Sequence, residues 1–539
     1  MSDLLPRPRS FEPATGTFEL APGASVSGPP ALVDGVRTAL PVLDLRVAGE
    51  GAITVRHEPG LGAESYTLTV TGDGITVAAG DRAGAFYAAQ TLRQLLGPAA
   101  YRAVAPEGSF TVPAGRVSDA PRFGWRGAMV DVARHFLPKR ELFRMVDVMA
   151  AHKLNRLHLH LVDDQGWRVE SPAFPRLHEV ASHRPRTIAS HYGEEPVFDE
   201  VPHGGHYTLA DLAEIAAYAR ARAVTVVPEI DVPGHASAIL AAYPEYGVNP
   251  AQEIAVLDRW GISPALLSPL PPTVEFLTTV FEELLGALGG APYVHIGGDE
   301  CVLDGWAVSA EITAYQASLG LGTPGDLHAW FLRGLADVLA ERGSRAVVWD
   351  EAFVSGTLRQ DTVVMPWRGM AVARRAAAAG HDVVMTPVFP LYFDYAEAAS
   401  ADEPLAIGEA ITVDDVAAFD PAPGSWEPAE SARVIGAQFQ LWSERIPDAR
   451  ALDYRAWPRG CALAEVAWAG PGPIGDRLPG HLARLDAMGV EYRPLAGPHP
   501  WQRGGAGRRG HRPGAVEIGA VMDRLDRMTL SADSTHSSL

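Results

Sequence analysis

The spacing of apolar and polar residues changes near residue 120. Before it, short β-branched runs alternate with Gly, Pro and Asp breaks, and an amphipathic helical pattern covers 81–96. After it, short apolar runs are separated by longer helical patterns, which is typical of repeated βα units. The pattern predicts a small α+β domain over 1–120 and an α/β domain over 121–493.

Eight candidate strands follow one another in the second domain. Their sequences are RGAMVDVAR, RLHLHLVDD, VTVVPEID, YVHIGGDE, RAVVWDE, TVVMPWR, DVVMTPVF and VIGAQFQLWSE. Clear helical patterns cover 138–153, 208–223, 273–288 and 327–343, while the returns after the fifth and seventh strands are short or missing. Eight strands with mostly helical returns predict a (β/α)8 TIM barrel. An open doubly wound sheet would need a glycine-rich phosphate loop after its first strand, and the sequence has none there.

Composition and charge narrow the function. With 47% apolar and 20% charged residues, the chain is typical of a globular protein. Its formal charge of −20 opposes binding to nucleic acid, so a neutral or weakly charged substrate fits better. No apolar stretch approaches the roughly 18 residues of a membrane helix, so we expect no membrane span. The two cysteines, Cys301 and Cys461, are too few for a disulfide framework, and we expect both to be buried.

The two ends of the chain carry weaker patterns. The opening MSDLLPRPRSFEPATG has no apolar run after its charges, so we expect a cytoplasmic protein, or a secreted one if a signal precedes this chain. Residues 494–539 are rich in Gly, Pro and Arg, which predicts a mostly flexible tail.

The clearest chemical motif is HIGGDE, residues 295–300, at the end of an apolar strand. The C-terminal strand ends are the face that carries the active site in barrel enzymes. Two adjacent carboxylates in an enclosed site cannot both ionise easily, so the pKa of one is pushed up. The two preceding glycines permit close approach of backbone or ligand. A capped turn with two solvated acids is the plain alternative.

Other motifs in the same order strengthen the case for an enzyme. They are DDQGWR at 163–168, EIDVPGH at 229–235, WDE at 349–351, LYFDY at 391–395 and LWSE at 441–444. Together with GGDE they resemble glycoside hydrolase family 20, the β-N-acetylhexosaminidases, over roughly residues 120–470. The N-terminal α+β unit also resembles the domain that usually precedes this family's barrel.

The resemblance implies a retaining, substrate-assisted reaction. In this family the substrate's own 2-acetamido oxygen attacks the anomeric carbon, an exception to the scheme with two protein carboxylates. Glu300 is implied to protonate the leaving oxygen and then to activate water. Asp299 is implied to orient the acetamido group and to stabilise the oxazolinium-like intermediate, which requires it to be ionised while Glu300 begins protonated.

Further site residues are implied at positions that match the family's motifs. Trp349, Trp367 and Trp442 match the tryptophans that form a cage around the acetamido group. Tyr392 matches the tyrosine whose phenol forms a hydrogen bond with the acetamido oxygen. Tryptophans are more often part of a protein core, and Tyr392 can also be a half-buried strand residue. The sequence departs from some relatives at about Ile407, where a tryptophan is expected, so one aromatic wall is in doubt.

Charged residues complete the implied sugar pocket. Arg134 matches an arginine that grips sugar hydroxyls, and Asp394 and Glu444 match acids that bind the outer hydroxyls and close the pocket, which predicts exo action. Surface salt bridges are the alternative for all three. A polar chain behind the acid is represented by Asp163 and His235, whereas Asp231 and Glu229 can equally be structural acids.

Two other functions stay open. His158 and His160 form an H-x-H pair that could belong to a metal-dependent barrel hydrolase, although the pair lies within the second strand and not at its tip. A sugar-binding protein without activity is the second alternative. We expect an exo-β-N-acetylhexosaminidase that acts on a small oligosaccharide or glycoconjugate and needs no metal or cofactor. The choice between gluco and galacto substrates, the natural glycan and the oligomeric state are not determined.

Overall fold

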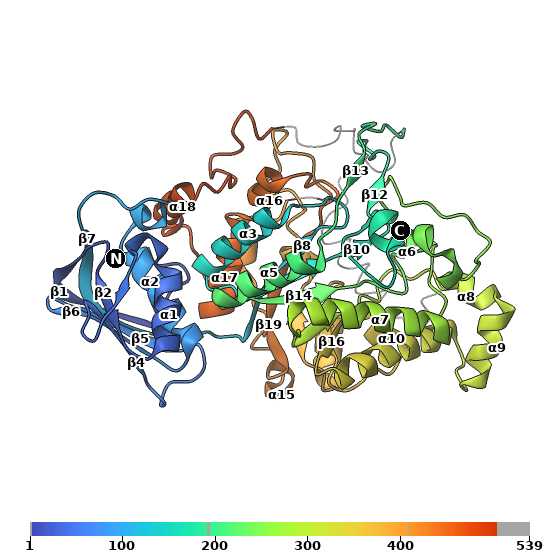
Figure 1. Cartoon of the computed structure of the whole chain (residues 1–539), viewed down its shortest axis with the longest axis horizontal. Coiled ribbons are helices and arrows are strands. Elements are labelled where there is room, and N and C mark those ends of the chain that lie inside the picture. Colours follow the sequence, from blue (N-terminus) through green and yellow to red (C-terminus); the bar gives the residue numbers. More distant parts are fainter. Residues whose placement is uncertain (1–2, 191–194, 409, 504–539) are drawn as a thin grey trace.

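A computed structural model describes residues 3–190, 195–408 and 410–503 of the chain. It contains a small N-terminal domain beside a larger barrel domain (Figure 1). Most of the predicted tail, 504–539, lies outside the described residues, and residues 494–503 contain no helix or strand.

The N-terminal domain is a mixed sheet with two helices. The sheet has seven strands in the order β1-β7-β5-β6-β4-β2-β3. Their bounds are β1 (Ser10–Leu20), β2 (Ser25–Ser27), β3 (Arg46–Val47), β4 (Ile53–His57), β5 (Tyr66–Thr71), β6 (Gly74–Ala79) and β7 (Phe110–Asp119). The helices are α1 (Pro30–Ala39) and α2 (Arg82–Leu95), with short 3-10 turns η1 (Pro41–Leu43) and η2 (Pro98–Tyr101). The amphipathic helix predicted at 81–96 is α2, which begins after Asp81 because its carboxylate accepts the Gly84 amide proton at 2.7 Å.

Eight parallel strands form a closed barrel in the second domain. They are β8 (Trp125–Asp131), β9 (Arg156–His160), β14 (Thr225–Glu229), β15 (Tyr293–His295), β16 (Arg345–Trp349), β17 (Val363–Met365), β18 (Val383–Met385) and β19 (Val434–Leu441). Seven of them lie inside the sequence segments predicted as strands, and β8 begins one residue before its segment. The barrel closes where β19 pairs with β8, so residues distant in sequence meet at one mouth. The predicted TIM barrel, preceded by a separate mixed α/β domain, is confirmed.

The helices around the barrel also follow the predicted pattern. The four strong helical patterns correspond to α3 (Lys139–Ala151), α5 (Leu209–Ala221), α7 (Pro271–Leu288) and α10 (Pro324–Glu341). The return after β16 begins with the short α11 (Asp350–Ser355), and the return after β18 with the shorter α13 (Val388–Leu391). The other helices in the described residues are α4 (Arg176–Glu179), α6 (Ser237–Ala242), α8 (Asp304–Val308), α9 (Ala310–Ser318), α12 (Met370–Ala378), α14 (Val413–Ala418), α15 (Pro428–Ser431), α16 (Ala449–Ala456), α17 (Arg459–Ala469) and α18 (Leu478–Ala487).

Short elements lie mainly in the loops at the barrel mouth. The hairpins are β10 (Val162–Asp163) with β11 (Gly166–Trp167), and β12 (His183–Arg184) with β13 (His203–Gly204). A 3-10 turn, η3 (Pro244–Tyr246), follows α6. These loops follow strands β9 and β14, so they stand beside the strand ends that carry the predicted site.

Buried charges join the two domains, and α2 lies between the N-terminal sheet and the barrel (Figure 1). The Arg126 guanidinium, on β8, donates to Glu64 at 2.9 Å and to the Tyr87 hydroxyl at 3.0 Å. The Lys153 ammonium is 2.8 Å from an oxygen of Asp119, and both side chains are buried. Because an unpaired buried charge is costly, these pairs couple the position of the first domain to the barrel.

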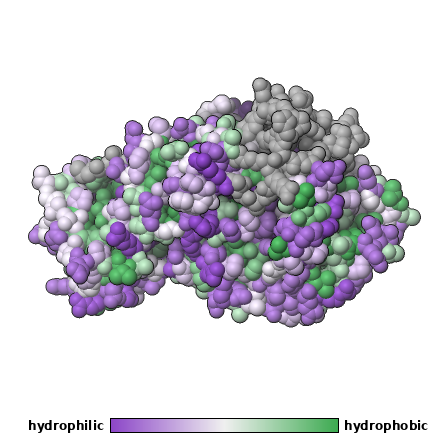
Figure 2. All heavy atoms as spheres, turned by 90° about the horizontal axis from the view of Figure 1, so that it is seen from above, coloured by the Kyte–Doolittle hydropathy of each residue, from purple (hydrophilic) through white to green (hydrophobic). Residues whose placement is uncertain are grey.

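The surface seen in Figure 2 mixes hydrophilic and hydrophobic side chains over both domains. Over the described ranges, none of the helices combines the length and the apolar character that a bilayer crossing requires.

Candidate functional site

The acid pair lies in a tight turn directly after β15. Gly297 and Gly298 have φ angles of +65° and +97°. A Cβ atom on Gly297 would lie 1.6 Å from Asp231 Oδ1, and one on Gly298 would lie 2.6 Å from the Leu332 side chain. Both positions therefore require glycine, because a side chain would displace a carboxyl group or a core residue.

Glu300 is held in a strained backbone conformation at the edge of the site. Its φ is +49°, and His235, which faces it, has a φ of +47°. Non-glycine residues in this region cost free energy and cluster at functional sites. The Glu300 carboxylate is 3.6 Å from His235 Nε2, and the Glu300 side chain is 27% exposed. Burial raises the pKa of Glu300, and the attraction of the charged His235 only partly opposes this rise. The carboxyl group therefore keeps its proton to a higher pH than an ordinary glutamic acid.

Asp299 is paired with a second buried carboxyl group, that of Asp231. Burial raises the pKa of Asp299 well above its ordinary value, and Asp231 raises it further. Burial likewise raises the pKa of Asp231 well above its ordinary value. Asp299 Oδ1 and Asp231 Oδ2 are both buried and lack a hydrogen-bond partner within the described ranges. Two carboxylates buried this close repel each other, which favours one proton within the pair.

A chain of charges supports His235 from behind. His235 Nδ1 is 3.2 Å from Asp163 Oδ1, and the other Asp163 oxygen is 2.7 Å from the Arg134 guanidinium. Burial would raise the pKa of Asp163, but Arg134 and His235 hold it well below its usual range. Burial would lower the pKa of His235, but Asp163 outweighs this and keeps the imidazole charged. The predicted association of Asp163 with His235 is present, and it includes Arg134.

Glu229 is a site residue whose role the sequence left undecided. It ends β14, in register with His160 on one neighbouring strand and His295 on the other. Its carboxylate is 2.7 Å from His295 Nδ1 and accepts the indole N–H of Trp349 at 2.9 Å. Glu229 thus fixes the orientation of Trp349 from below. A signal in the sequence could have identified it. In the predicted barrel order, the strand that ends in Glu229 lies between two strands that carry histidines.

The same acid explains the H-x-H pair of β9. His158 Nε2 is 3.0 Å from Glu229, and His160 bonds both Glu229 and, at 2.9 Å, Asp163. Burial lowers the pKa of His158 to about 4, so this ring is neutral. Burial also disfavours the charged form of His160, but Glu229 and Asp163 raise its pKa to about 10. Both rings of the pair are therefore bonded to carboxylates inside the barrel, which accounts for them without a metal.

The predicted aromatic residues gather in one cluster at the barrel mouth. Trp349 and Trp442 are buried with ring centroids 5.8 Å apart, and Tyr392 is 6.1 Å from Trp442. Trp367 packs on the same cluster, and its indole N–H donates to Glu351 at 2.9 Å. Trp349 and Trp442 are buried, whereas Trp367 and Tyr392 are half-buried and are therefore the predicted aromatic residues most open to a ligand.

Arg134 and Asp394 are buried and Glu444 is half-buried, so the surface-salt-bridge alternative is wrong for Arg134 and Asp394. Burial raises the pKa of Asp394 well above its ordinary value, and Glu444 raises it further. Burial also raises the pKa of Glu444. Asp394 Oδ1 and Glu444 Oε2 are buried and lack a hydrogen-bond partner within the described ranges, which suits a ligand that supplies hydroxyl donors. The Ile407 amide donates to the Asp394 carbonyl at 3.3 Å, so the missing aromatic side chain concerns this part of the pocket.

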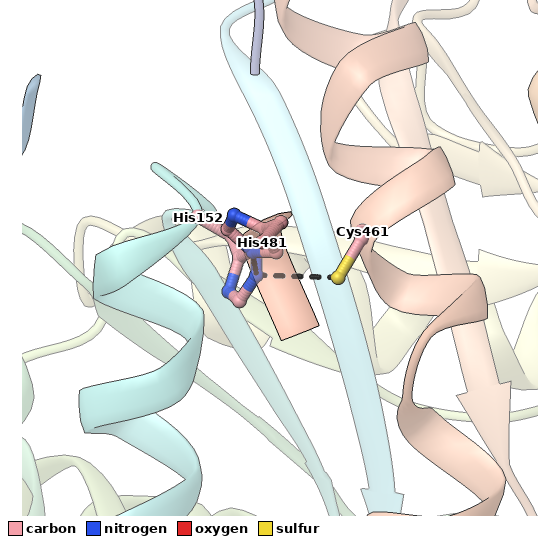
Figure 3. Close-up of side chains that lie close together, drawn as sticks. All are labelled: His152, Cys461 and His481. Atoms are coloured by element: carbon pink, nitrogen blue, oxygen red, sulfur yellow. Dashed lines mark hydrogen bonds between the residues drawn. The ribbon is translucent and has the colours of Figure 1, made fainter. Parts of the chain in front are cut away.

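A second cluster, His152, Cys461 and His481, lies between α3, α17 and α18 (Figure 3). The two Nε2 atoms are 2.7 Å apart, and Cys461 Sγ is 3.3 Å from His152 Nε2. His152 Nδ1 donates to the Val148 carbonyl at 2.7 Å, and Arg484 approaches His481 Nδ1 at 3.2 Å. Because Arg484 can only donate, His481 carries its proton on Nε2 and donates it to His152. The nitrogen lone pairs are thereby used, and the cluster is a hydrogen-bonded link between helices. Both cysteines are buried and free, as expected.

Comparison with known proteins agrees with this architecture. The sequence profile described as "Glycosyl hydrolase family 20, catalytic domain" matches residues 123–471, and that of "Glycosyl hydrolase family 20, domain 2" matches residues 1–120.

Relatives and solved structures match most of the chain. A beta-hexosaminidase of Akkermansia muciniphila is 37% identical over 423 residues, which cover 78% of this chain and 81% of that protein. A beta-hexosaminidase of Porphyromonas gingivalis is 34% identical over 88% of this chain, which spans only 60% of that protein's length. The structure of the Streptomyces plicatus N-acetyl-beta-hexosaminidase in complex with Thio-NAglucal has a TM-score of 0.77 and 30% identity, covering 91% of this chain and 96% of that one. The family resemblance predicted from the motifs is confirmed, and this chain belongs to glycosyl hydrolase family 20, a family of glycoside hydrolases.

Proposed function

We propose that the protein is a retaining exo-β-N-acetylhexosaminidase that works by substrate assistance. The observation that carries this proposal is the pair at 299–300: a partly exposed acid whose pKa burial raises, next to a buried carboxyl group with an unpaired oxygen. The first group suits a general acid and the second suits contact with an amide N–H or a positive charge.

Glu300 is proposed to act first as an acid and then as a base. It donates its proton to the glycosidic oxygen while the bond from that oxygen to the anomeric carbon breaks. The acetamido oxygen of the same sugar bonds to this carbon from the opposite face and forms an oxazolinium ion. Glu300 then takes a proton from water. The water oxygen bonds to the anomeric carbon while the bond from this carbon to the acetamido oxygen breaks, which opens the oxazolinium ring. Two inversions at one carbon give net retention.

Asp299 is proposed to face the acetamido N–H and to stabilise the positive charge of the intermediate. This requires the proton of the carboxyl pair to reside on Asp231 during the reaction. Asp231 Oδ1 already accepts the Gly298 amide proton at 3.2 Å, which leaves Oδ2 free to carry that proton. An anionic Asp299 at this buried position interacts strongly with a cation, because little water screens it.

The pocket walls support exo action on an N-acetylhexosamine. Tyr392, Trp367 and Trp442 are proposed to enclose the acetamido group, with Trp349 beneath them. The unpaired oxygens of Asp394 and Glu444 are proposed to bind the outer hydroxyls, together with Arg134. Two structurally similar proteins support this substrate class: an exo beta-N-acetylglucosaminidase from Vibrio harveyi was solved with N-acetylglucosamine, and a Streptomyces plicatus beta-hexosaminidase variant with its product GlcNAc.

A panel of p-nitrophenyl glycosides tests the proposal. We expect release of nitrophenol from the β-N-acetylglucosaminide or the β-N-acetylgalactosaminide, and at least about 100-fold less from the β-glucoside, which lacks the internal nucleophile. Proton NMR of the first product should show the β-anomer. Equal cleavage of the plain glucoside would refute substrate assistance. Binding without turnover would favour the sugar-binding alternative, and loss of activity in EDTA with recovery in zinc would favour the metal-dependent one.

A further inference from the structure

The segment between α13 and α14 carries Asp394 and wraps around two buried arginine side chains. Arg455 comes from α16 and Arg459 from α17, and their exposed fractions are 2% and 0%. Both helices follow β19 on the outside of the barrel, so the arginines approach the segment from outside the sugar pocket.

The Arg459 guanidinium bonds both ends of this segment. Its Nη2 donates to the Phe393 carbonyl at 2.6 Å, and its Nη1 to the carbonyls of Tyr395 and Ile411, each at 3.1 Å. Phe393 lies between Tyr392 and Asp394, two residues that the proposed reaction uses. The position of both side chains is therefore tied to one guanidinium group, which presents its five N–H donors in a rigid planar fork.

Arg455 bonds the middle of the same segment. Its Nη2 donates to the Leu405 carbonyl at 2.8 Å and to the Pro404 carbonyl at 3.1 Å. The two arginines thus donate to carbonyls at both ends and in the middle of the described segment, residues 393–408 and 410–411. Buried carbonyls need such donors, because an unpaired one costs as much as a lost hydrogen bond.

The segment has little regular structure of its own. Within its described residues, 393–408 and 410–411, there is no helix or strand. Its internal backbone bonds include Ile411 N to the Ala396 carbonyl at 2.8 Å and Ile407 N to the Asp394 carbonyl at 3.3 Å. A backbone held by few bonds of its own depends on the side chains around it for its conformation.

The charge of Arg459 also has a buried counterpart in the segment. Glu397 Oε2 is 3.7 Å from Arg459 Nε, and neither side chain is more than 3% exposed. A second acid of the segment, Glu403, accepts from Arg493 at 2.7 Å and from the Tyr454 hydroxyl at 2.7 Å. The segment is therefore attached to α16 and α17 through its carbonyls and to their surroundings through its acids.

We infer that Arg459, assisted by Arg455, is a positioning residue for sugar binding: it holds Tyr392 and Asp394 in register with Trp442 and Glu444, which follow β19. The identity of the ligand rests on the proposed function, whereas the support of the segment does not. A lysine at position 459 keeps the charge but replaces the planar fork by a single ammonium, so it cannot bond all three carbonyls in the same geometry.

Kinetics of Arg459→Lys, with Arg374→Lys as a matched control, test the inference. Arg374 lies on α12, is half exposed and pairs with Glu430 at 2.9 Å. We expect Arg459→Lys to raise KM for the aryl N-acetylhexosaminide and to lower kcat/KM at least about 10-fold, because small misplacements of binding groups are costly. Arg374→Lys should leave both constants unchanged. Unchanged constants in a folded Arg459→Lys protein would overturn the inference.

A double-mutant cycle separates positioning from general damage. If Arg459 acts through Asp394, Arg459→Lys should cost less than about 3-fold in an Asp394→Asn background, because the two changes remove one shared interaction. Effects that simply multiply would refute the link. Arg455→Lys serves as the second variant if Arg459→Lys does not fold, and the same non-additivity with Asp394→Asn is expected.

Hydrogen exchange gives a readout that does not depend on activity. Amides in 393–411 should exchange faster in Arg459→Lys, while the barrel strands stay protected as in the unchanged protein. Uniformly faster exchange would indicate global destabilisation and would contradict the inference. If the unchanged protein cleaves no aryl glycoside, the proposed function fails, and the exchange result still decides whether Arg459 supports the segment.

Discussion

Replacing Asp231 by Asn or by Ala distinguishes the two places where the shared proton of the carboxyl pair can reside. Asp231 Oδ1 accepts the Gly298 amide proton at 3.2 Å, and its other oxygen is unpaired and buried near Asp299. The amide of Asn can still accept from Gly298 and can donate to Asp299, as a protonated Asp231 does. Alanine removes both interactions.

The two hydrogen bonds set the expected magnitude. A bond between neutral groups contributes about 1 kcal/mol, and one to a charged group about 1.5–3 kcal/mol. If both hydrogen bonds of Asp231 stabilise the transition state, their loss in Asp231→Ala lowers kcat about 10²- to 10³-fold. Asp231→Asn should stay within about 10-fold of the unchanged protein, because it retains both bonds.

The assay is kcat on the aryl N-acetylhexosaminide at the optimum pH, together with thermal unfolding of each variant. Asp453→Asn, a buried carboxyl-to-amide change on α16 at a carboxylate that pairs with Arg144 of α3, is the matched control and should leave kcat unchanged. If Asn at position 231 is as damaging as Ala, then Asp231 acts as an anion and the proton resides on Asp299, which would refute the reasoning.

Four further predictions follow from single contacts. Glu300→Gln should lower kcat about 10²- to 10⁴-fold with little change in binding, while Glu311→Gln on the exposed face of α9 should not. Gly297→Ala should lower kcat by about 100-fold or more, because its Cβ would overlap Asp231 Oδ1 at 1.6 Å, whereas Gly334→Ala, which meets nothing within 4 Å inside α10, should be harmless or stabilising. His235→Gln removes a charge that lowers the pKa of Glu300, so the alkaline limb of the kcat/KM profile should move to higher pH; a move to lower pH would contradict this. Lys153→Met leaves the Asp119 carboxylate buried without its cation, and urea unfolding should show a loss of about 3–5 kcal/mol.

The fold was predictable because local patterns and global topology agree in this chain. Each of the eight apolar runs after residue 120 became a barrel strand, and each strong helical pattern became a helix. The two short returns were also visible, since α11 and α13 are brief in the structure as in the pattern. Such agreement across levels is what makes a sequence specify one fold.

The site was only partly predictable. Residues at strand ends could be collected from the sequence, because parallel strands bring their C-terminal ends to one face. Burial could not be inferred, and it changed the interpretation of Arg134 and Asp394 from possible surface charges to buried groups. The raised pKa of Asp299 could not be foreseen either, because it comes from burial and from the carboxyl of Asp231, which lies at a different strand end.

The sequence by itself determined the barrel, the adjacent acids after a pair of glycines, and the order of the motifs that mark the family. Tertiary structure alone decided which polar groups meet. It brings Asp231 to Asp299, and Glu229 to His158, His160, His295 and Trp349. It also brings the arginines of α16 and α17 to the carbonyls of Phe393 and Leu405. The physical reason is that strand and helix patterns depend on neighbours in sequence, whereas pKa values and side-chain orientation depend on groups that only the closed barrel brings within a few ångströms.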